Sequence, residues 1–299
     1  MKYTFLLPAF KARFFEEALG SILAQTYCDF EVIVSDDCSP EDLKSIVDKF
    51  ADPRVKYRRN EKNIGAEHLV DHWNLLLGLT DAEYIIMASD DDVYDPRYLE
   101  EMDRLARKYP EANVVRPLIR IINAEGRTTF EEQYPGKERL DVNEFLELWG
   151  TERLMSGVPY YVFKAEALKK SGGFVDYPYA HFSDDATVVS GIIGYNLVIS
   201  DRISFSFRQS GANISYATKR EDKYKKVAVS IHFCRMLKTL NIARQSREFA
   251  DDRIFKVARD LLGSCKGNLP LLLKTILNPA MPFNLKQRII LLSDYIEAL

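Results

Sequence analysis

The first hundred residues alternate between short apolar runs and amphipathic segments, and this alternation restricts the fold more than any other feature. The apolar runs have the length of strands, and the segments between them carry apolar residues at helical spacing. Alternating strands and helices are typical of a mostly parallel sheet with helices on both faces. The predicted strands are residues 3–10, 30–37, 54–60 and 83–92, and the predicted helices are residues 12–26, 39–51 and 65–80.

The second of these helices has a predicted start. Ser39 is a favoured residue type for an N-cap, and Pro40 suits the first helical position. We therefore expect the helix to begin at this pair.

Beyond residue 112 the predicted secondary structure changes twice along the chain. Residues 113–214 are expected to mix strands and helices, and the helix within 157–174 is expected to stop at Gly172. From Glu221 onward the spacing of apolar residues predicts a mainly helical region. The predicted organisation is an α/β domain in two parts followed by a helical appendage: residues 1–215, divided at about 1–112 and 113–215, and residues 216–299.

Charge follows the same division. Residues 215–299 carry 16 Lys and Arg against 8 Asp and Glu, a net charge of +8, which leaves −11 on residues 1–214. Nucleic acid is a poor partner for so acidic a region, and the basic region has no recognisable nucleic-acid motif. The stretch 269–296 mixes apolar residues with Lys and Arg, as in a segment lying on an anionic membrane. Lys and Arg at 219–226 are equally typical of a solvated helix face.

Composition and cysteine usage favour a globular protein of the cytoplasm. No stretch reaches the roughly 20 apolar residues needed to span a bilayer. The four cysteines are scattered and form no CxxC pair, as expected for reduced thiols. We expect a cytoplasmic protein that contacts the inner face of the membrane peripherally through residues 216–299.

Acidic clusters follow two of the predicted strands. Asp36 and Asp37 end one strand, and Asp90, Asp91 and Asp92 end another. Ligands of such sheets bind beyond the carboxyl ends of the strands, so both clusters can face one cleft. Carboxylates packed together repel unless a cation lies between them, and carboxylate oxygens suit Mg²⁺ or Mn²⁺. The alternative is a solvated acidic turn.

A third acidic pair, Asp184 and Asp185, opens a predicted helix. Acidic residues in a first turn are often only partners of the helix dipole. Next to a metal and nucleotide site, one of them could instead take a proton from an acceptor hydroxyl. Both interpretations stay open at this point.

A Rossmann dehydrogenase is set aside, because "PAFKARFF" after the first strand has no glycine. Six short motifs occur in order within about residues 1–215, and each is weak alone: "QT", "FEVIVSDDCS", "NIG", "WN", "EYIIMASDDD" and "SGGF". As an ordered set they resemble the family 2 nucleotide-sugar glycosyltransferases, which have the Rossmann-like GT-A fold.

The resemblance implies a binding site for a nucleoside-diphosphate sugar. Pro8 and Phe10 match the exit of the family's first strand into the nucleotide site. Asp37 matches the aspartate that contacts the base, and Asn63 and Gly65 match the loop near the nucleotide.

The resemblance also implies a metal and an acceptor side. Asp90, Asp91 and Asp92 cover the metal-binding DxD motif, with Asp91 and Asp92 expected as ligands of Mn²⁺ or Mg²⁺ and Asp90 on the donor. Asp185 matches the proposed general base, and Asp184 takes the place often held by glutamate. His181 and Trp149 are further candidates for acceptor contact. The alternatives are an ordinary loop histidine and a core tryptophan.

The implied function is an inverting, metal-dependent transfer of a sugar, with a UDP-sugar favoured, to a hydroxyl of a glycan or lipid-linked acceptor in bacterial surface polysaccharide synthesis. The QxxRW motif of processive enzymes is absent. Many members carry a histidine in the segment that closes over the diphosphate, where this chain has Gln209 and Ser210. A non-catalytic nucleotide-binding or scaffolding role in a glycan assembly complex is therefore the alternative.

Overall fold

The computed structural model describes residues 2–211 and 220–263, together with residues 273, 276–279, 281, 283–284 and 287–292. Its strands are β1 (Tyr3–Ala9), β2 (Phe30–Asp36), β3 (Val55–Arg59), β4 (Tyr84–Met87), β5 (Val93–Tyr94), β6 (Val114–Asn123), β7 (Thr128–Glu131), β8 (Arg139–Leu140), β9 (Val162–Lys164) and β10 (Leu197–Gln209). Within this part of the chain they form one ten-stranded sheet in the order β3-β2-β1-β4-β9-β6-β10-β5, with β7 paired to β6 and β8 paired to β10.

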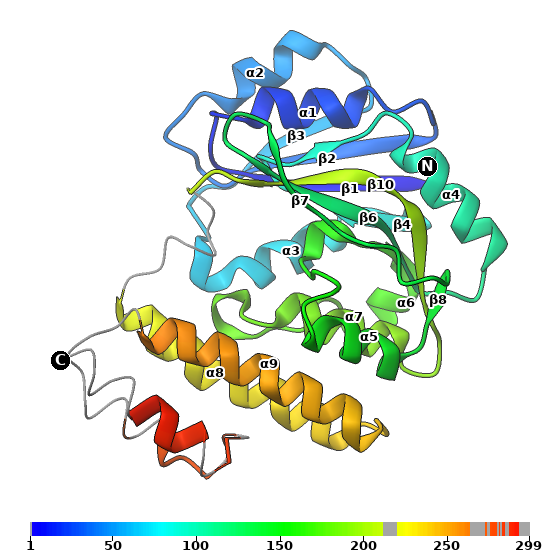
Figure 1. Ribbon diagram of the computed structural model, residues 1–299. Coiled ribbons are helices and arrows are strands. Elements are labelled where there is room, and N and C mark those ends of the chain that lie inside the picture. The colour runs from blue at the N-terminus through cyan, green and yellow to red at the C-terminus, as the bar shows by residue number, and fades with distance from the viewer. Residues whose placement is uncertain are drawn as a thin grey trace.

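Helices cover both faces of this sheet (Figure 1). The α-helices are α1 (Phe15–Leu23), α2 (Leu43–Phe50), α3 (Leu69–Leu77), α4 (Tyr98–Lys108), α5 (Val142–Gly150), α6 (Ala165–Lys170), α7 (Ser183–Ile192), α8 (Arg220–Thr239) and α9 (Arg244–Gly263). Three short 3₁₀ helices are η1 (Ala66–His68), η2 (Val158–Tyr160) and η3 (Pro178–Ala180). In Figure 1, α1 and α2 lie on one side of the sheet, and α3, α5 and α7 lie on the other.

The first half of the sheet is parallel, as the alternation of elements predicts. β1 lies between β2 and β4 and runs parallel to both, and β2 runs parallel to β3. The strands β2 and β4 are buried along their whole length, as expected of parallel strands covered on both faces. The carboxyl ends of β1, β2 and β4 therefore meet at one edge of the sheet. The α/β fold with a helical C-terminal region is confirmed.

Two predicted helix starts differ from the structure. The helix α2 begins at Leu43, and its N-cap is Asp42, whose Oδ1 accepts a hydrogen bond from Ser45 N at 3.1 Å. The prediction of Ser39 as the cap is wrong: its hydroxyl accepts from Glu41 N at 3.0 Å in a turn that precedes the helix, and donates to Phe10 O at 2.6 Å, which links the ends of β1 and β2. The predicted helix over 65–80 opens with the 3₁₀ turn η1 before α3.

The second half of the sheet is mixed. β9 runs antiparallel to both β4 and β6, whereas β10 runs parallel to β6. The helix α6 stops as predicted, since Gly172 follows its C-cap with a φ of 97°. The helix α5 starts in a capping box between Asp141 and Glu144.

The helices α8 and α9 run side by side and pack against the α/β domain at α5 (Figure 1). At Gly150 a Cβ atom would come within 2.7 Å of the backbone of Phe249 in α9. A separate apolar cluster joins these two helices to residues nearer the C-terminus: Val227, Ile231, Ala258, Ile276, Met281, Phe283 and Leu291. None of the described helices is long and apolar enough to cross a membrane.

Candidate active site

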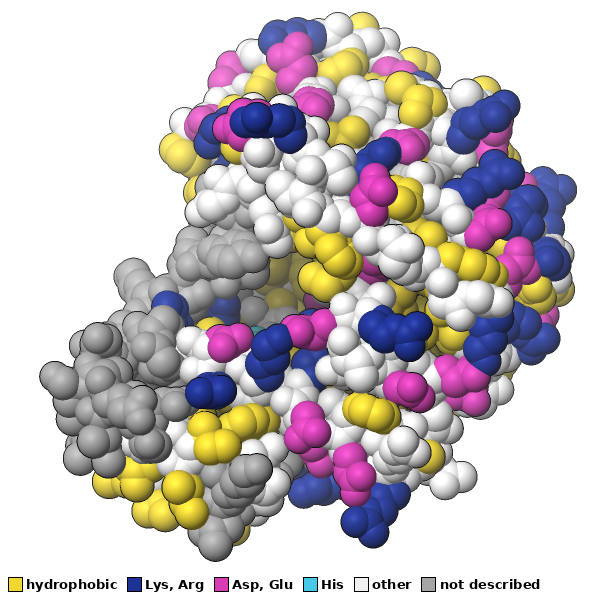
Figure 2. All heavy atoms as spheres, viewed as in Figure 1, with side chains coloured by type: hydrophobic (Ala, Val, Ile, Leu, Met, Phe, Trp, Pro, Cys, Tyr) yellow, Lys and Arg dark blue, Asp and Glu magenta, His cyan; other side chains and the backbone are white. Residues whose placement is uncertain are grey.

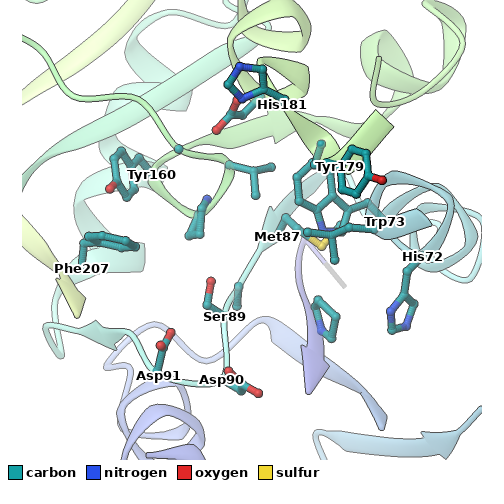
Figure 3. A pocket seen from close by; sticks show the side chains of 18 of the residues that line it. His72, Trp73, Met87, Ser89, Asp90, Asp91, Tyr160, Tyr179, His181 and Phe207 are labelled. Atoms are coloured by element: carbon teal, nitrogen blue, oxygen red, sulfur yellow. The ribbon is translucent and has the colours of Figure 1, made fainter. Parts of the chain in front are cut away.

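A cavity of about 750 Å³ opens where the carboxyl ends of β1, β2 and β4 meet. Figure 2 shows the surface hollowed between the sheet and the C-terminal helices. In Figure 3, Asp90 and Asp91 lie at one end of the cavity and His181 lies at the other. Tyr160 lies along one side, and Trp73 lies along the opposite side. Nine of the predicted site residues line this one cavity: Pro8, Phe10, Asp37, Asn63, Gly65, Asp90, Asp91, Asp184 and Asp185, and with them the candidate His181.

The turn after β4 is tied to the end of β1. Asp90 Oδ2 accepts hydrogen bonds from the backbone N–H groups of Phe10 and Lys11, each at 2.8 Å. Burial raises the pKa of Asp90, although these two hydrogen bonds work in the other direction. This carboxylate therefore fixes the two strand ends against each other.

The neighbouring aspartates have different surroundings. Asp91 lines the cavity, and burial together with the charge of Asp90 raises its pKa to about 6. Asp92 is fully buried outside the cavity, and its Oδ1 accepts a hydrogen bond from Arg208 N at 2.9 Å. The position of Asp92 does not fit the predicted role of a metal ligand, because its carboxylate faces the end of β10.

The residues present fit a divalent cation that a substrate also holds. Two like charges lie together in Asp90 and Asp91, and burial raises the pKa of both. Among the residues that the structure describes, no group of three His, Cys, Asp or Glu could hold a metal. Mg²⁺ and Mn²⁺ suit such a site, since Mg²⁺ is commonly held by one or two carboxylates together with the phosphates of a substrate.

The side chain of Asp37, which directly follows β2, binds the loop that follows β3. Its Oδ1 accepts from Asn60 Nδ2 at 2.8 Å and from Ile64 N at 2.9 Å. Its Oδ2 accepts from Asn63 Nδ2 at 3.0 Å and from Gly65 N at 3.1 Å. Four hydrogen bonds match the lone pairs of a carboxylate. In this structure Asp37 therefore holds the loop that lines the cavity.

The pair Asp184 and Asp185 lies in the first turn of α7, as predicted. Burial raises the pKa of Asp185, while hydrogen bonding from Ser156, the charge of Arg253 and hydrogen bonding from Trp149 lower it. Burial and the charge of Asp185 raise the pKa of Asp184 well above its usual range. Asp185 Oδ1 is buried and has no hydrogen-bond partner within the described part of the chain.

His181 and Trp149, the two further acceptor candidates, have different positions. His181 lines the cavity, and burial together with the charge of Lys226 lowers its pKa to about 3, so the ring is neutral. Trp149 lies in α5, is buried and does not line the cavity. Its ring packs edge-on against Phe182 and Phe233, so its contact is with the core and with Asp185 rather than with an acceptor.

The sequence did not point to several residues that line the cavity. Ser156–Tyr160 form one wall, and α8 and α9 add Lys226 and Arg253. Tyr179 lines the cavity next to Ala180 in a segment where Tyr179, Ala180 and Phe182 all have a positive φ, of 62°, 52° and 62°. Such backbone strain is frequent at functional sites. The sequence does not predict it here, because none of the three residues is a glycine. Half of the segment 208–215, residues 212–215, lies outside the described residues.

Comparisons with known proteins agree on one family. The model of glycosyl transferase family 2 matches residues 4–166, more than half of the chain. A putative colanic acid biosynthesis glycosyl transferase, WcaA of Escherichia coli, is 38% identical over 84 residues, which are 27% of this chain and 29% of that protein. An uncharacterized glycosyltransferase of Haemophilus influenzae is 25% identical over 155 residues, 52% of this chain and 50% of that protein. The chain thus spans half or less of the length of these relatives.

Solved structures share the fold at low identity. Residues 1–349 of S. aureus TarS superpose with a TM-score of 0.69 at 17% identity, covering 100% of this chain and 81% of that one. The complex of the same protein with UDP-GlcNAc gives 0.67 at 18% identity, with the same coverage. A mannosyltransferase from Pyrobaculum calidifontis with GDP-Man and Mn²⁺ gives 0.56 at 17% identity, covering 99% of this chain and 85% of that one.

Proposed function

The chain belongs to glycosyl transferase family 2, and from this premise we propose that it is an inverting, metal-dependent glycosyltransferase. Its donor is a nucleoside-diphosphate sugar, with a UDP-sugar favoured, and its acceptor is a hydroxyl of a glycan or lipid-linked molecule. The observation that carries the proposal is the single cavity that Asp37, Asp91 and Asp185 line although they are far apart in sequence.

On the donor side, the proposal assigns three tasks to the chain. The loop held by Asp37 lines the nucleotide end of the cavity with Asn63 and Gly65. Asp90 fixes the turn after β4 by binding the amides of Phe10 and Lys11. Asp91 would hold Mn²⁺ or Mg²⁺ together with the diphosphate, where the metal would offset charge on the leaving group.

On the acceptor side, Asp185 is the proposed base. Its unpartnered Oδ1 can accept the proton of an acceptor hydroxyl that enters the cavity. The Arg253 charge lowers the pKa of this carboxyl against the effect of burial, which favours the ionised form. A single displacement at the anomeric carbon would invert its configuration.

The biological setting is part of the proposal. The similarity to a putative colanic acid biosynthesis glycosyl transferase supports a surface polysaccharide as product. The absence of a CxxC pair and the +8 charge of residues 215–299 support a cytoplasmic location with peripheral contact at an anionic membrane. About a third of that region, including half of 269–296, lies outside the described residues.

A thermal-shift panel of UDP, GDP, CDP and TDP, each with and without Mn²⁺, tests the donor half of the proposal. A ligand that binds the folded chain stabilises it by about 2.7 kcal/mol at a hundredfold excess over its dissociation constant. We expect one nucleotide to raise Tm in a Mn²⁺-dependent way, and Asp91→Asn to remove only the Mn²⁺-dependent part. If no nucleotide raises Tm, either with or without Mn²⁺, the non-catalytic role replaces the enzymatic one. Gln209 and Ser210 favour that role.

A further inference from the structure

An ion pair lies buried in the second half of the sheet, away from the carboxylates of the cavity. Arg116 Nη2 lies 2.5 Å from Glu132 Oε2, and both side chains are fully buried. Arg116 belongs to β6, and Glu132 follows β7 directly. Desolvation makes such a pair a weak source of stability, and apolar residues of similar volume often replace one at no cost. The hydrogen bonds that the pair makes therefore indicate what it does.

Both members of the pair bind the backbone of the same distant residue. Met155 N donates to Glu132 Oε1 at 2.6 Å, and Arg116 Nη1 donates to Met155 O at 2.6 Å. The other hydrogen bonds are local, from Ile119 N to Glu132 Oε2 at 3.0 Å and from Arg116 Nε to Pro117 O at 2.9 Å. The pair thus holds Met155 from both its donor and its acceptor side.

The segment that starts at Met155 becomes a wall of the cavity. Ser156–Tyr160, called the 156–160 wall below, all line it. The guanidinium of Arg116 also lies 5.8 Å from the ring centre of Tyr160 and 5.4 Å from that of Tyr161. Arg116 therefore contacts the wall at its far end as well.

Ser156 links this wall to the proposed base. Tyr161 Oη donates to Ser156 Oγ at 3.0 Å, which leaves the hydroxyl proton of Ser156 for another acceptor. Ser156 and Asp185 line the same cavity. Burial raises the pKa of Asp185, and hydrogen bonding from Ser156 works against this effect.

We propose that the Arg116–Glu132 ion pair is a positioning device that fixes the 156–160 wall and, through Ser156, the carboxylate of Asp185. The role of the wall rests on the contacts of Met155, whereas the role toward Asp185 rests on the function proposed above. The pair lies outside the cavity, so both residues act through Met155 rather than on a substrate.

The first test needs no substrate. In Arg116→Met/Glu132→Leu we expect backbone amides of residues 155–161 to exchange hydrogen at least tenfold faster, with exchange in β1 and β4 unchanged. Arg116→Lys is the second variant, because a lysine can still pair with Glu132 but lacks the planar fork that reaches two carbonyls. We expect a smaller acceleration in the same segment. Unchanged exchange at 155–161 in either folded variant overturns the proposal.

A matched control replaces an ion pair between the start of β1 and α4. Lys2 Nζ lies 2.6 Å from Asp103 Oδ1, in a pair that is mostly buried and does not line the cavity. Lys2→Met/Asp103→Leu is expected to leave exchange at 155–161 unchanged. Equal acceleration there in the control would reduce the effect to general loosening and would also overturn the proposal.

The second test addresses Asp185 with Ser156→Ala and nucleotide-sugar turnover, measured first as hydrolysis of UDP-GlcNAc, GDP-Man and the donor that the nucleotide panel selects. Loss of the Ser156 hydrogen bond raises the pKa of Asp185, so the acid side of the kcat/KM profile is expected to move to higher pH, with nucleotide affinity within twofold of wild type. An unmoved profile overturns the link through Ser156. Absence of turnover in the wild-type chain would count against the proposed function, while the exchange experiment still decides the role of the pair.

Discussion

At the scale of single residues, the three aspartates at 90–92 show what a sequence pattern can predict and what it cannot. The pattern predicts that they follow a buried strand and face a cleft; they do follow β4, and Asp90 and Asp91 line the cavity whereas Asp92 does not. The pattern cannot predict which contact each aspartate makes, because the directions of consecutive side chains in a turn depend on the surrounding chain. Asp90 binds the amides of Phe10 and Lys11, Asp91 faces the cavity, and Asp92 binds the backbone of Arg208.

The assignment of Asp185 as base gives a first prediction. Asp185→Asn removes the proton acceptor but keeps the shape of the side chain, so we expect transfer to fall by about 10²–10⁴-fold. The nucleotide-dependent thermal shift is expected to stay as in wild type, because the donor end of the cavity is unchanged. Asp184→Asn is the matched control and should lose less activity, since Asp184 is not the proposed base, and burial with the charge of Asp185 raises its pKa and so disfavours its ionised form. Wild-type transfer by Asp185→Asn would exclude this carboxylate as the base.

A second prediction concerns stability rather than activity. Burial raises the pKa of Asp251, in α9, to about 6, although Lys238 and Arg247 act against burial. A carboxyl with a raised pKa in the folded state destabilises that state above its folded pKa and has no effect below its unfolded pKa. Asp251→Asn should therefore raise Tm by about 2–4 °C at pH 7.5, a gain of about 1 kcal/mol after allowance for partial exposure. Calorimetry at pH 7.5 and at pH 3.5 checks this, and a gain of the same size at both pH values would contradict it.

At the scale of elements, the types of the first helices and strands follow from periodicity, whereas their ends depend on contacts made elsewhere. Ser39 has the chemistry of an N-cap, yet its oxygen accepts from Glu41 N in a preceding turn, and Asp42 caps α2, which starts at Leu43. Trp149 belongs to α5, and its ring is buried against Phe182 and against Phe233 of α8, which lie too far along the chain for local periodicity to predict the contact. Arg116 is a charge inside an apolar run, and its partner Glu132 lies beyond an unpredicted hairpin.

The packing of α9 on α5 gives the third prediction. Gly150→Ala would bring a Cβ atom within 2.7 Å of the backbone of Phe249, so α9 must move. We expect a loss of about 1–3 kcal/mol in the free energy of unfolding, as is usual for overpacking. Arg253 follows Phe249 by one helical turn and lines the cavity, so turnover should fall as well.

Gly20→Ala is the matched control for this variant. Gly20 lies inside α1, and an added Cβ atom would meet only the ring of Phe50 at an ordinary 3.5 Å. Alanine is favoured over glycine in a helix, so this variant should be as stable as wild type or more stable. Chemical denaturation of both variants measures the difference, and equal stabilities would show that α9 adapts to the added methyl group without cost.

At the scale of the whole molecule, the cavity unites parts of the chain that the sequence divides. The rule that ligands bind beyond strand ends predicts the edge formed by β1, β2 and β4. The contribution of Lys226 and Arg253 from α8 and α9 could not be predicted, because helical periodicity shows which face is apolar but not against what it packs. The boundary predicted at residue 215 therefore separates two kinds of composition, yet residues on both sides of it line one cavity.

The last prediction concerns membrane contact and rests on the basic composition after residue 215. Residues 215–299 have a net charge of +8, and within the described part of this region Leu277 and Ile289 are exposed apolar side chains, at 70% and 58%. Basic residues attract a protein to anionic lipid by about 1 kcal/mol each near the surface, and salt screens this attraction. In flotation experiments we expect the chain to bind vesicles with 30% phosphatidylserine at low salt, to bind them less at 0.5 M NaCl, and not to bind neutral phosphatidylcholine vesicles. Leu277→Ser/Ile289→Ser should weaken the binding without changing its dependence on salt, because it removes apolar area and no charge. If the chain does not bind anionic vesicles at low salt, the proposed contact with the membrane would be withdrawn. The +8 charge would then be assigned to binding of a protein or glycan partner.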